Sequence, residues 1–226
     1  FKDDFINKGQ SHILQYNYQD RLIINMGYSY HYNSIGGAII NNTIASNSYS
    51  IRFNFESAGN IMYALSKATN IRKNNDGEYA ILGIPYAQYV KGEFDFSKNI
   101  RIDHRNSFAF HIGMGIAVPY GNAKTIPFEK QYFSGGANSV RGWTVRDLGP
   151  GSFVRDENTN LLDQPGDIKL DASIEYRSKL FWKFQGAIFV DAGNIWTIRD
   201  YDNQPGGVFK FDKFYKQIAV AYGLGL

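Results

Sequence analysis

The chain contains no cysteine and no long apolar run among its 226 residues. Without cysteine there can be neither the disulfide framework of a small secreted domain nor a thiolate metal or redox site. No segment approaches the roughly 18 consecutive apolar residues of a membrane-spanning helix, so a helical membrane protein is excluded. The net charge of +3 is small for this length and gives no electrostatic footprint of nucleic-acid binding.

An initiator methionine is also lacking, because the chain begins at Phe1. The first residues have neither the charged start nor the apolar core of a signal peptide. We therefore expect a chain that is mature, processed or cut from something larger.

Aromatic side chains, in contrast, are plentiful, with 16 Tyr, 17 Phe and 3 Trp making up 16% of the residues. Such a content is typical of the aromatic girdles at the two interfaces of a transmembrane β-barrel, although soluble sandwiches are also rich in tyrosine. The mean hydropathy of -0.36 resembles that of a soluble protein. A barrel has similar values, since only every second strand residue faces lipid.

Apolar and polar side chains alternate along many segments, which is the pattern of β-strands with one apolar face. In residues 167–177 every charged side chain falls on the same side. Seven strands are predicted in this way, at residues 22–32, 49–56, 86–97, 107–118, 167–177, 184–196 and 217–226. An eighth, at residues 11–18, is shorter and less regular.

Alternation alone does not separate a soluble sandwich from a barrel in lipid, but strand length favours the barrel. Several runs reach 10 to 13 residues, against about 5 to 6 in soluble proteins and about 9 to 11 in membrane strands. The non-apolar face also carries small residues that suit an inner wall with something packed closely on it, namely Gly113, Gly115, Ala117, Ala219, Ala221, Gly223 and Gly225. The predicted fold is an all-β, antiparallel transmembrane β-barrel.

Short and long connections alternate between the predicted strands, as they do in outer-membrane barrels. Long connections start near Gly59, Pro119 and Thr197, and we expect them on the outer side. Short turns lie near Asn99 and Ser178, and we expect them on the periplasmic side.

The longest connection carries a motif. Residues 131–153 read QYFSGGANSVRGWTVRDLGPGSF, and Val140, Arg141, Gly142 and Trp143 form its VRGW core. This core resembles the VRG[F/Y/W] signature of the BamA/TamA-type outer-membrane insertase superfamily, and residues 172–177 (ASIEYR) and 189–196 (FVDAGNIW) resemble the two strands that follow it there. Residues 48–60 and 84–96 look closer to TamA-like members than to BamA.

The resemblance implies the architecture and the site. Residues 1–226 would be the C-terminal half of a sixteen-stranded barrel, with seven or eight strands present, and residues 119–166 an extracellular loop folded into the lumen. The motif arginine, Arg141, would contact acidic partners at Glu175 and Asp191. The residues agree with this, because both carboxylates fall on the polar face of adjacent predicted strands and a guanidinium can make paired hydrogen bonds to them. For Arg141 alone, a surface arginine beside a turn glycine would be the default interpretation.

The resemblance also implies the function, which is a non-enzymatic assembly, insertion or translocation factor of the bacterial outer membrane that templates substrate strands at a lateral seam. Implied partners are outer-membrane lipid, nascent outer-membrane or exported proteins, periplasmic or lipoprotein partners, and an N-terminal half with POTRA domains. Two alternatives stay open at this point: a two-partner secretion transporter, and a passive barrel with a structural or adhesive role.

Enzymatic and metal chemistry find little support in the sequence. His12, His31, His104 and His111 lack metal-ligand spacing, and no Ser-His-Asp arrangement stands out. The glycines at 135–136 and 149–151 are not followed by the lysine and helix of a phosphate-binding loop. We expect no cofactor, no metal and no catalytic residue, and we expect Trp182 and Trp196 to anchor the membrane interfaces.

Overall fold

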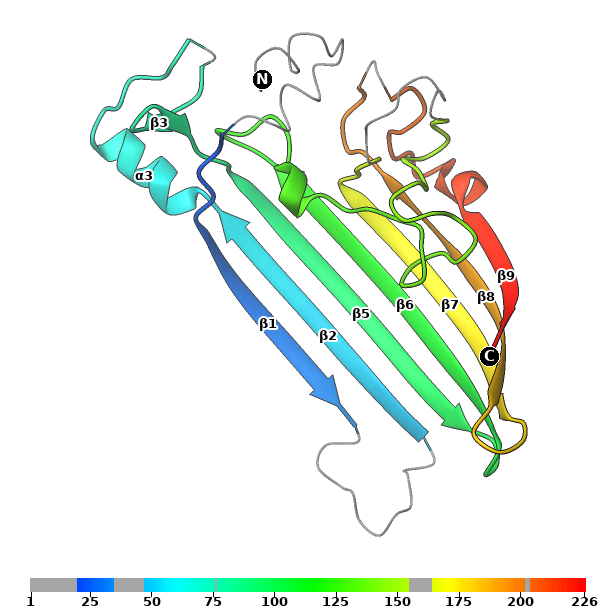
Figure 1. Ribbon diagram of the computed structural model, residues 1–226. Coiled ribbons are helices and arrows are strands. Elements are labelled where there is room, and N and C mark those ends of the chain that lie inside the picture. Colours follow the sequence, from blue (N-terminus) through cyan, green and yellow to red (C-terminus); the bar gives the residue numbers. More distant parts are fainter. Residues whose placement is uncertain (1–19, 35–46, 76, 155–163, 202–203) are drawn as a thin grey trace. The chain divides into compact units, whose positions relative to one another are not determined.

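A computed structural model describes residues 20–34, 47–75, 77–154, 164–201 and 204–226. Its main element is a seven-stranded sheet in which strands that follow one another in sequence also lie side by side (Figure 1). The strands in sheet order are β1 (Asn25–Asn33), β2 (Asn47–Ala58), β5 (Tyr89–Arg101), β6 (Asn106–Pro119), β7 (Ile168–Lys179), β8 (Gln185–Trp196) and β9 (Ala219–Gly225). The pairs β6–β7, β7–β8 and β8–β9 are antiparallel.

The seven predicted strands are confirmed, with bounds that shift by a few residues. The strand predicted at 22–32 becomes β1 at Asn25–Asn33, and the one predicted at 86–97 becomes β5 at Tyr89–Arg101. The eighth predicted strand, at residues 11–18, lies outside the described residues.

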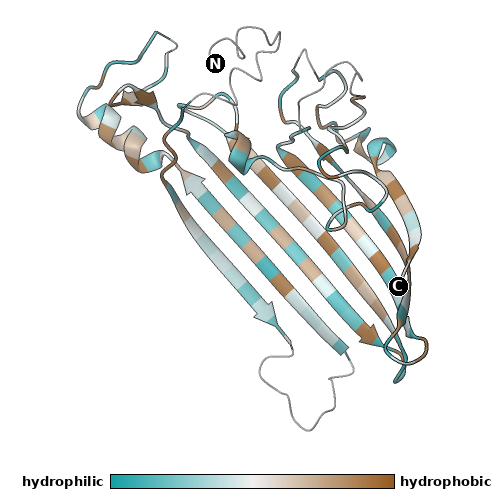
Figure 2. Ribbon diagram, in the orientation of Figure 1, coloured by the Kyte–Doolittle hydropathy of each residue, from teal (hydrophilic) through white to brown (hydrophobic). Residues whose placement is uncertain are grey.

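The two faces of the strands differ as the alternation predicts, and Figure 2 shows the resulting bands along them. On β6, Ile112, Met114 and Ile116 are exposed, whereas Gly113 and Gly115 between them are buried. We call the face that carries Gly113 and Gly115 the inner face, and the opposite one the outward face. An exposed apolar outward face next to a covered face of small and polar residues is the inverse of a soluble sheet that packs on a core.

Contacts divide the chain into two compact units. The first comprises Phe1–Gly27, Glu56–Lys91 and Ala117–Gln131, and the second comprises Tyr28–Phe55, Gly92–Ile116 and Tyr132–Leu226. The second unit contains the greater part of the sheet and the whole VRGW motif.

The first unit holds an element that the alternation did not predict. The long connection predicted to start near Gly59 contains helix α3 (Asn60–Ala68) and a small hairpin of β3 (Ala80–Ile81) and β4 (Ile84–Pro85). A nine-residue helix is too short to give a clear periodic signal. Asn122 fixes this region, because its amide accepts from Tyr79 N–H at 2.6 Å and donates to the carbonyls of Tyr79 and Tyr86 at 2.9 and 3.0 Å.

Two tight turns close the short connections. Between β5 and β6, the Asp103 carboxylate accepts N–H groups of Arg105 at 2.7 Å and Asn106 at 2.9 Å. A further hydrogen bond from the Asn106 side chain lowers the pKa of Asp103 below its ordinary value. Between β7 and β8, Leu180 N–H donates to the Phe184 carbonyl at 3.0 Å, and Trp182 at the tip is 86% exposed.

None of the helices in the described ranges is long and apolar enough to cross a membrane.

Candidate functional site

The connection between β6 and β7 contains a folded segment that lies over the inner face of the second unit (Figure 1). Tyr132 and Gly166 pair their backbones at 2.8 Å in both directions, and so fix the entry to this segment beside its exit. Gly136 N–H donates to the Trp143 carbonyl at 3.0 Å and closes a smaller loop around the motif. Gly135 and Gly136 both have positive φ, as this turn requires.

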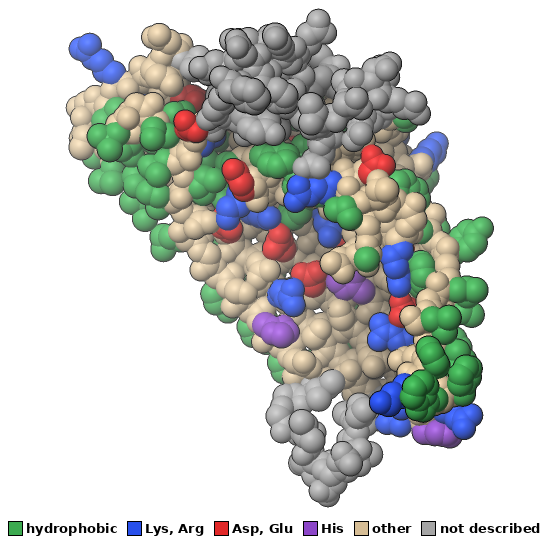
Figure 3. Space-filling model, viewed as in Figure 1, with side chains coloured by type: hydrophobic (Ala, Val, Ile, Leu, Met, Phe, Trp, Pro, Cys, Tyr) green, Lys and Arg blue, Asp and Glu red, His purple; other side chains and the backbone are tan. Residues whose placement is uncertain are grey.

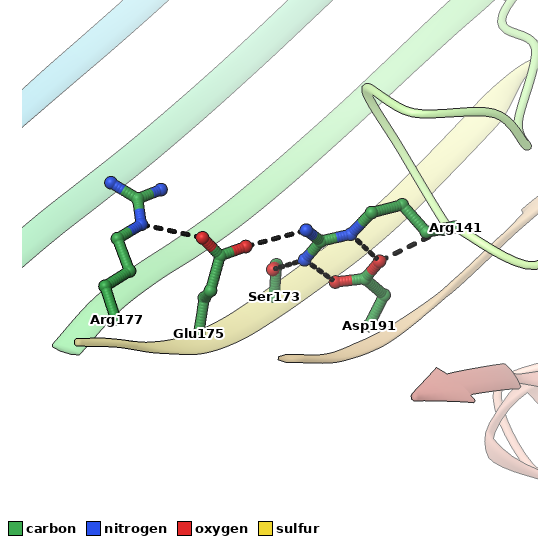
Figure 4. Close-up of polar contacts among 5 residues, drawn as sticks. All are labelled: Arg141, Ser173, Glu175, Arg177 and Asp191. Atoms are coloured by element: carbon green, nitrogen blue, oxygen red, sulfur yellow. Dashed lines mark hydrogen bonds and ion pairs between the residues drawn. The ribbon is translucent and has the colours of Figure 1, made fainter. Parts of the chain in front are cut away.

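Arg141 at the tip of the segment binds both of its predicted partners (Figure 4). Its Nε and Nη2 donate to the two Asp191 oxygens at 2.7 and 2.8 Å, which is a bidentate pair. Its Nη1 donates to Glu175 at 2.6 Å, and its backbone N–H donates to Asp191 at 3.0 Å. Paired, charge-assisted hydrogen bonds of this kind are the strong ones in proteins, and they set orientation as well as attraction.

The strand register explains why these groups converge. On β7 and β8, Ser173 is paired with Asp191 and Glu175 with Phe189, and all four side chains project from the inner face. Ser173 accepts from Arg141 Nη2 at 3.3 Å. The guanidinium also lies 3.5 Å above the centre of the Phe189 ring, where the negative face of the ring attracts a cation.

Small residues on β9 make room for this arrangement. A side chain at Gly223 would lie 2.6 Å from the Phe189 ring, and one at Gly142 would lie 3.1 Å from Ala221. Val140 is fully buried and packs with Leu148, Ala221 and Trp143. Of the small inner-face residues predicted from the sequence, Ala219 and Ala221 therefore receive the motif segment.

Asp191 and Glu175 differ in burial, and this difference ranks their contacts with Arg141 by expected contribution to stability. The Asp191 side chain is 1% exposed, that of Glu175 14% and that of Arg141 28%. Glu175 has a second cation, because Arg177 Nε lies 2.6 Å from it, whereas Asp191 receives three hydrogen bonds from Arg141. The hydrogen bond to Asp191, followed by that to Glu175, raises the pKa of Arg141 above its ordinary value.

This difference gives a prediction for the two carboxylates. Asp191→Asn should weaken the binding of the motif segment to the inner face by about 2–3 kcal/mol, because a nearly fully buried acceptor of charge-assisted hydrogen bonds loses its charge. Glu175→Gln should cost about 1 kcal/mol or less, since Glu175 is more exposed. Rates of proteinase K cleavage within residues 131–154 of the membrane-embedded protein measure both effects. Equal effects of the two substitutions would contradict the ranking.

Three contributors to this site were not predicted from the sequence, namely Ser173, Arg177 and Phe189. Ser173 and Arg177 are each two residues from Glu175, and Phe189 is two residues from Asp191. Side chains two residues apart on a strand share a face, so this spacing was the signal that could have placed them beside the predicted carboxylates. What was missing was the register that places Ser173 opposite Asp191.

Charged and histidine side chains gather on the inner face (Figure 3), and a second polar cluster there contains a Ser-His-Asp contact that residue spacing in the sequence does not indicate. His111 Nδ1 lies 3.1 Å from Ser97 Oγ, and its Nε2 lies 3.2 Å from Asp171. Asp171 is also 3.0 Å from Lys169 Nζ. Because Lys169 and His111 share this carboxylate, we interpret the cluster as an ion-pair network of the inner wall. Within the described part of the chain, no group of three or more potential ligands could hold a metal ion.

Trp182 and Trp196 lie at opposite ends of β8 and differ in their surroundings. Trp182 is highly exposed, as an interface anchor would be, whereas Trp196 is fully buried against Phe209 and Phe214. For Trp196 the structure therefore supports packing within the protein.

A sheet with an exposed apolar outward face and a covered inner face of small and polar residues is typical of a membrane β-barrel protein. The model of the Omp85 superfamily domain matches residues 6–226. The chain belongs to the Omp85 superfamily, and its sheet is part of an integral β-barrel of the bacterial outer membrane.

Two relatives illustrate the similarity. The outer membrane protein assembly factor BamA of Neisseria meningitidis is 35% identical over 99 residues, which cover 40% of this chain and 12% of that protein. The crystal structure of BamA from Haemophilus ducreyi lacking POTRA domains 1–3 has a TM-score of 0.46 at 18% identity, over 89% of this chain and 47% of that one. The chain thus spans less than half the length of either relative. The predicted closeness to TamA-like members stays a prediction.

Proposed function

We propose that this chain belongs to a barrel that inserts proteins into the outer membrane, and that residues 119–166 act there as a loop held inside the lumen by Arg141. Membership of the Omp85 superfamily and similarity to a protein named an outer membrane protein assembly factor support a role in insertion or secretion. The observation that carries the loop assignment is the bidentate pair between Arg141 and the buried Asp191.

The geometry suggests what such a loop does. Arg141 connects the motif segment to β7 and β8, and Val140 and Gly142 connect it to β9. A segment fixed to three consecutive strands would stiffen that wall and occupy the lumen beside it. Substrate strands would then be templated at a lateral seam by edge addition, with substrate folding as the source of energy.

This proposal includes partners that lie beyond the chain. Residues 1–226 would form the C-terminal half of a sixteen-stranded barrel, preceded by further strands and POTRA domains. Nascent outer-membrane proteins would be its substrates, and periplasmic or lipoprotein partners would deliver them. No step of this mechanism is enzymatic or requires a cofactor, because backbone pairing supplies the interaction.

Depletion of the protein in its own cells tests the proposal. Folded outer-membrane barrels resist unfolding in cold detergent and shift on a gel after heating, so their amount can be measured directly. We expect the folded fraction of several unrelated barrels to fall while a soluble exported protein still reaches the medium. Loss of one exported protein with normal barrel assembly would instead identify a two-partner secretion transporter, and loss of neither would indicate a passive barrel.

A further inference from the structure

The outward face of the second unit contains a groove of about 380 Å³, on the side of the sheet opposite Arg141. Its walls are apolar side chains, among them Phe94, Met114, Ile116 and Leu170. Gly92 on β5 contributes no side chain, and an added Cβ there would meet no atom within 4 Å. Gly92 therefore leaves open space in the lining of the groove.

Three aromatic side chains, Trp196, Phe209 and Phe214, form part of the lining of the groove. The Phe209 and Phe214 rings are stacked with centres 5.4 Å apart, and Trp196 meets both edge-on at 5.6 and 6.2 Å. The indole N–H of Trp196 donates to Gln217 at 2.8 Å, which satisfies its only polar group. This packing fixes residues 209–217 next to the groove.

Residues 209–217 also carry several exposed positive charges. Lys210, Lys213 and Lys216 are exposed, and in the described ranges none of them forms an ion pair. Lys216 lies 5.8 Å from the ring centre of Tyr215, and Asp212 is the single carboxylate among residues 209–217. Backbone hydrogen bonds from Lys213 to Lys210 at 2.9 Å and from Lys216 to Lys213 at 3.0 Å hold the lysines in one compact turn.

We propose that the groove and this turn form a binding site for a membrane lipid with an anionic phosphate headgroup. One acyl chain occupies the groove over Gly92, and the phosphate lies at Lys210, Lys213 and Lys216. The outer-membrane location places lipid against the outward face, and the charge of the turn is complementary to a phosphate. Non-specific contacts between lipid and the outward face would require neither a groove nor three exposed lysines on the segment that lines it.

Native mass spectrometry of the detergent-purified protein tests the proposal. The protein is incubated with an equimolar mixture of phosphatidylglycerol and phosphatidylcholine that carry the same acyl chains, and retained lipid is counted. We expect at least about a tenfold preference for phosphatidylglycerol, because three lysines at the usual attraction of each for an anionic surface would give up to about a hundredfold. The preference should disappear in Lys210→Gln/Lys213→Gln/Lys216→Gln, whereas Lys183→Gln in the β7–β8 turn should leave it unchanged.

Occupation of the groove is tested separately. Gly92→Leu places a side chain in open space and should lower retention of both lipids several-fold. The control is Val190→Leu, on the outward face of β8 and outside the lining of the groove, and it should leave the retention of both lipids unchanged. Heat-dependent gel mobility verifies that each variant is folded. Equal retention of the two lipids, a preference that survives the triple substitution, or full displacement of phosphatidylglycerol by inorganic phosphate would overturn the proposal.

Discussion

Replacing Arg141 by alanine should release the motif segment from the inner face while the barrel stays folded in the membrane. The substitution removes four side-chain hydrogen bonds and leaves Asp191, which is 1% exposed, without its guanidinium. Breaking a buried ion pair by deleting one partner costs about 3–5 kcal/mol, and we expect about 2–4 kcal/mol here because Arg141 is partly exposed. The measurement is proteinase K cleavage of residues 131–154 in outer-membrane vesicles, which should accelerate roughly thirtyfold or more.

Arg146→Ala is the matched control for this experiment. Arg146 lies in the same segment, is exposed, and has its guanidinium 4.5 Å from the centre of the Phe133 ring. Because Arg146 is exposed, each of its side-chain contacts contributes about 0.5–1 kcal/mol at most, and cleavage should change only a few-fold. Arg141→Lys should behave more like alanine than like arginine, since lysine cannot form the bidentate pair. Unchanged cleavage and unchanged assembly activity in Arg141→Ala would remove the site assignment.

The second large effect is expected at the entry to the motif segment. Tyr132 lies over Gly115 of β6, and its hydroxyl donates to the Gly92 carbonyl at 3.3 Å. A Cβ at Gly115 would come within 2.5 Å of the Tyr132 ring. Tyr132 cannot retreat as a unit, because its backbone is paired with Gly166 in both directions. Gly115→Val should therefore displace the ring and destabilise the segment by about 1–3 kcal/mol.

Hydrogen exchange of residues 131–135 in the reconstituted protein measures this displacement. Ala109→Val, on the same face of β6, is the control and should change exchange little. If the clash between the valine and the Tyr132 ring is the cause, adding Gly115→Val to Tyr132→Ala should cause no further loss of protection from hydrogen exchange. The ring that obstructs the valine is already absent from Tyr132→Ala. Full additivity of the two substitutions would show that Gly115 acts in some other way.

The sheet was predictable because one physical pattern repeats in every strand. Apolar side chains at every second position marked all seven main strands, and the lengths of those runs separated a membrane sheet from a soluble one. Helix α3 was missed because nine residues give too few turns for a clear pattern. The β3–β4 hairpin was missed because each of its strands has only two residues.

The candidate site was predictable only in part. The motif and the polar faces of two strands indicated that Arg141 should meet Glu175 and Asp191, and the structure brings these three together. Their role in protein assembly stays a prediction. Phe189 and Ser173 could not be assigned, because which residues lie opposite each other depends on strand register. The network of Ser97, His111 and Asp171 joins three strands, so sequence spacing carries no signal for it.

A double-mutant cycle between Arg141 and Asp191 tests the central claim most directly, with loop cleavage in membranes as the measured quantity. If Arg141 holds the segment through Asp191, the double variant Arg141→Ala/Asp191→Ala should be cleaved no faster than Arg141→Ala alone. That result corresponds to a coupling free energy between the two side chains of about 2 kcal/mol or more. Independent, additive effects of the two substitutions would contradict the account.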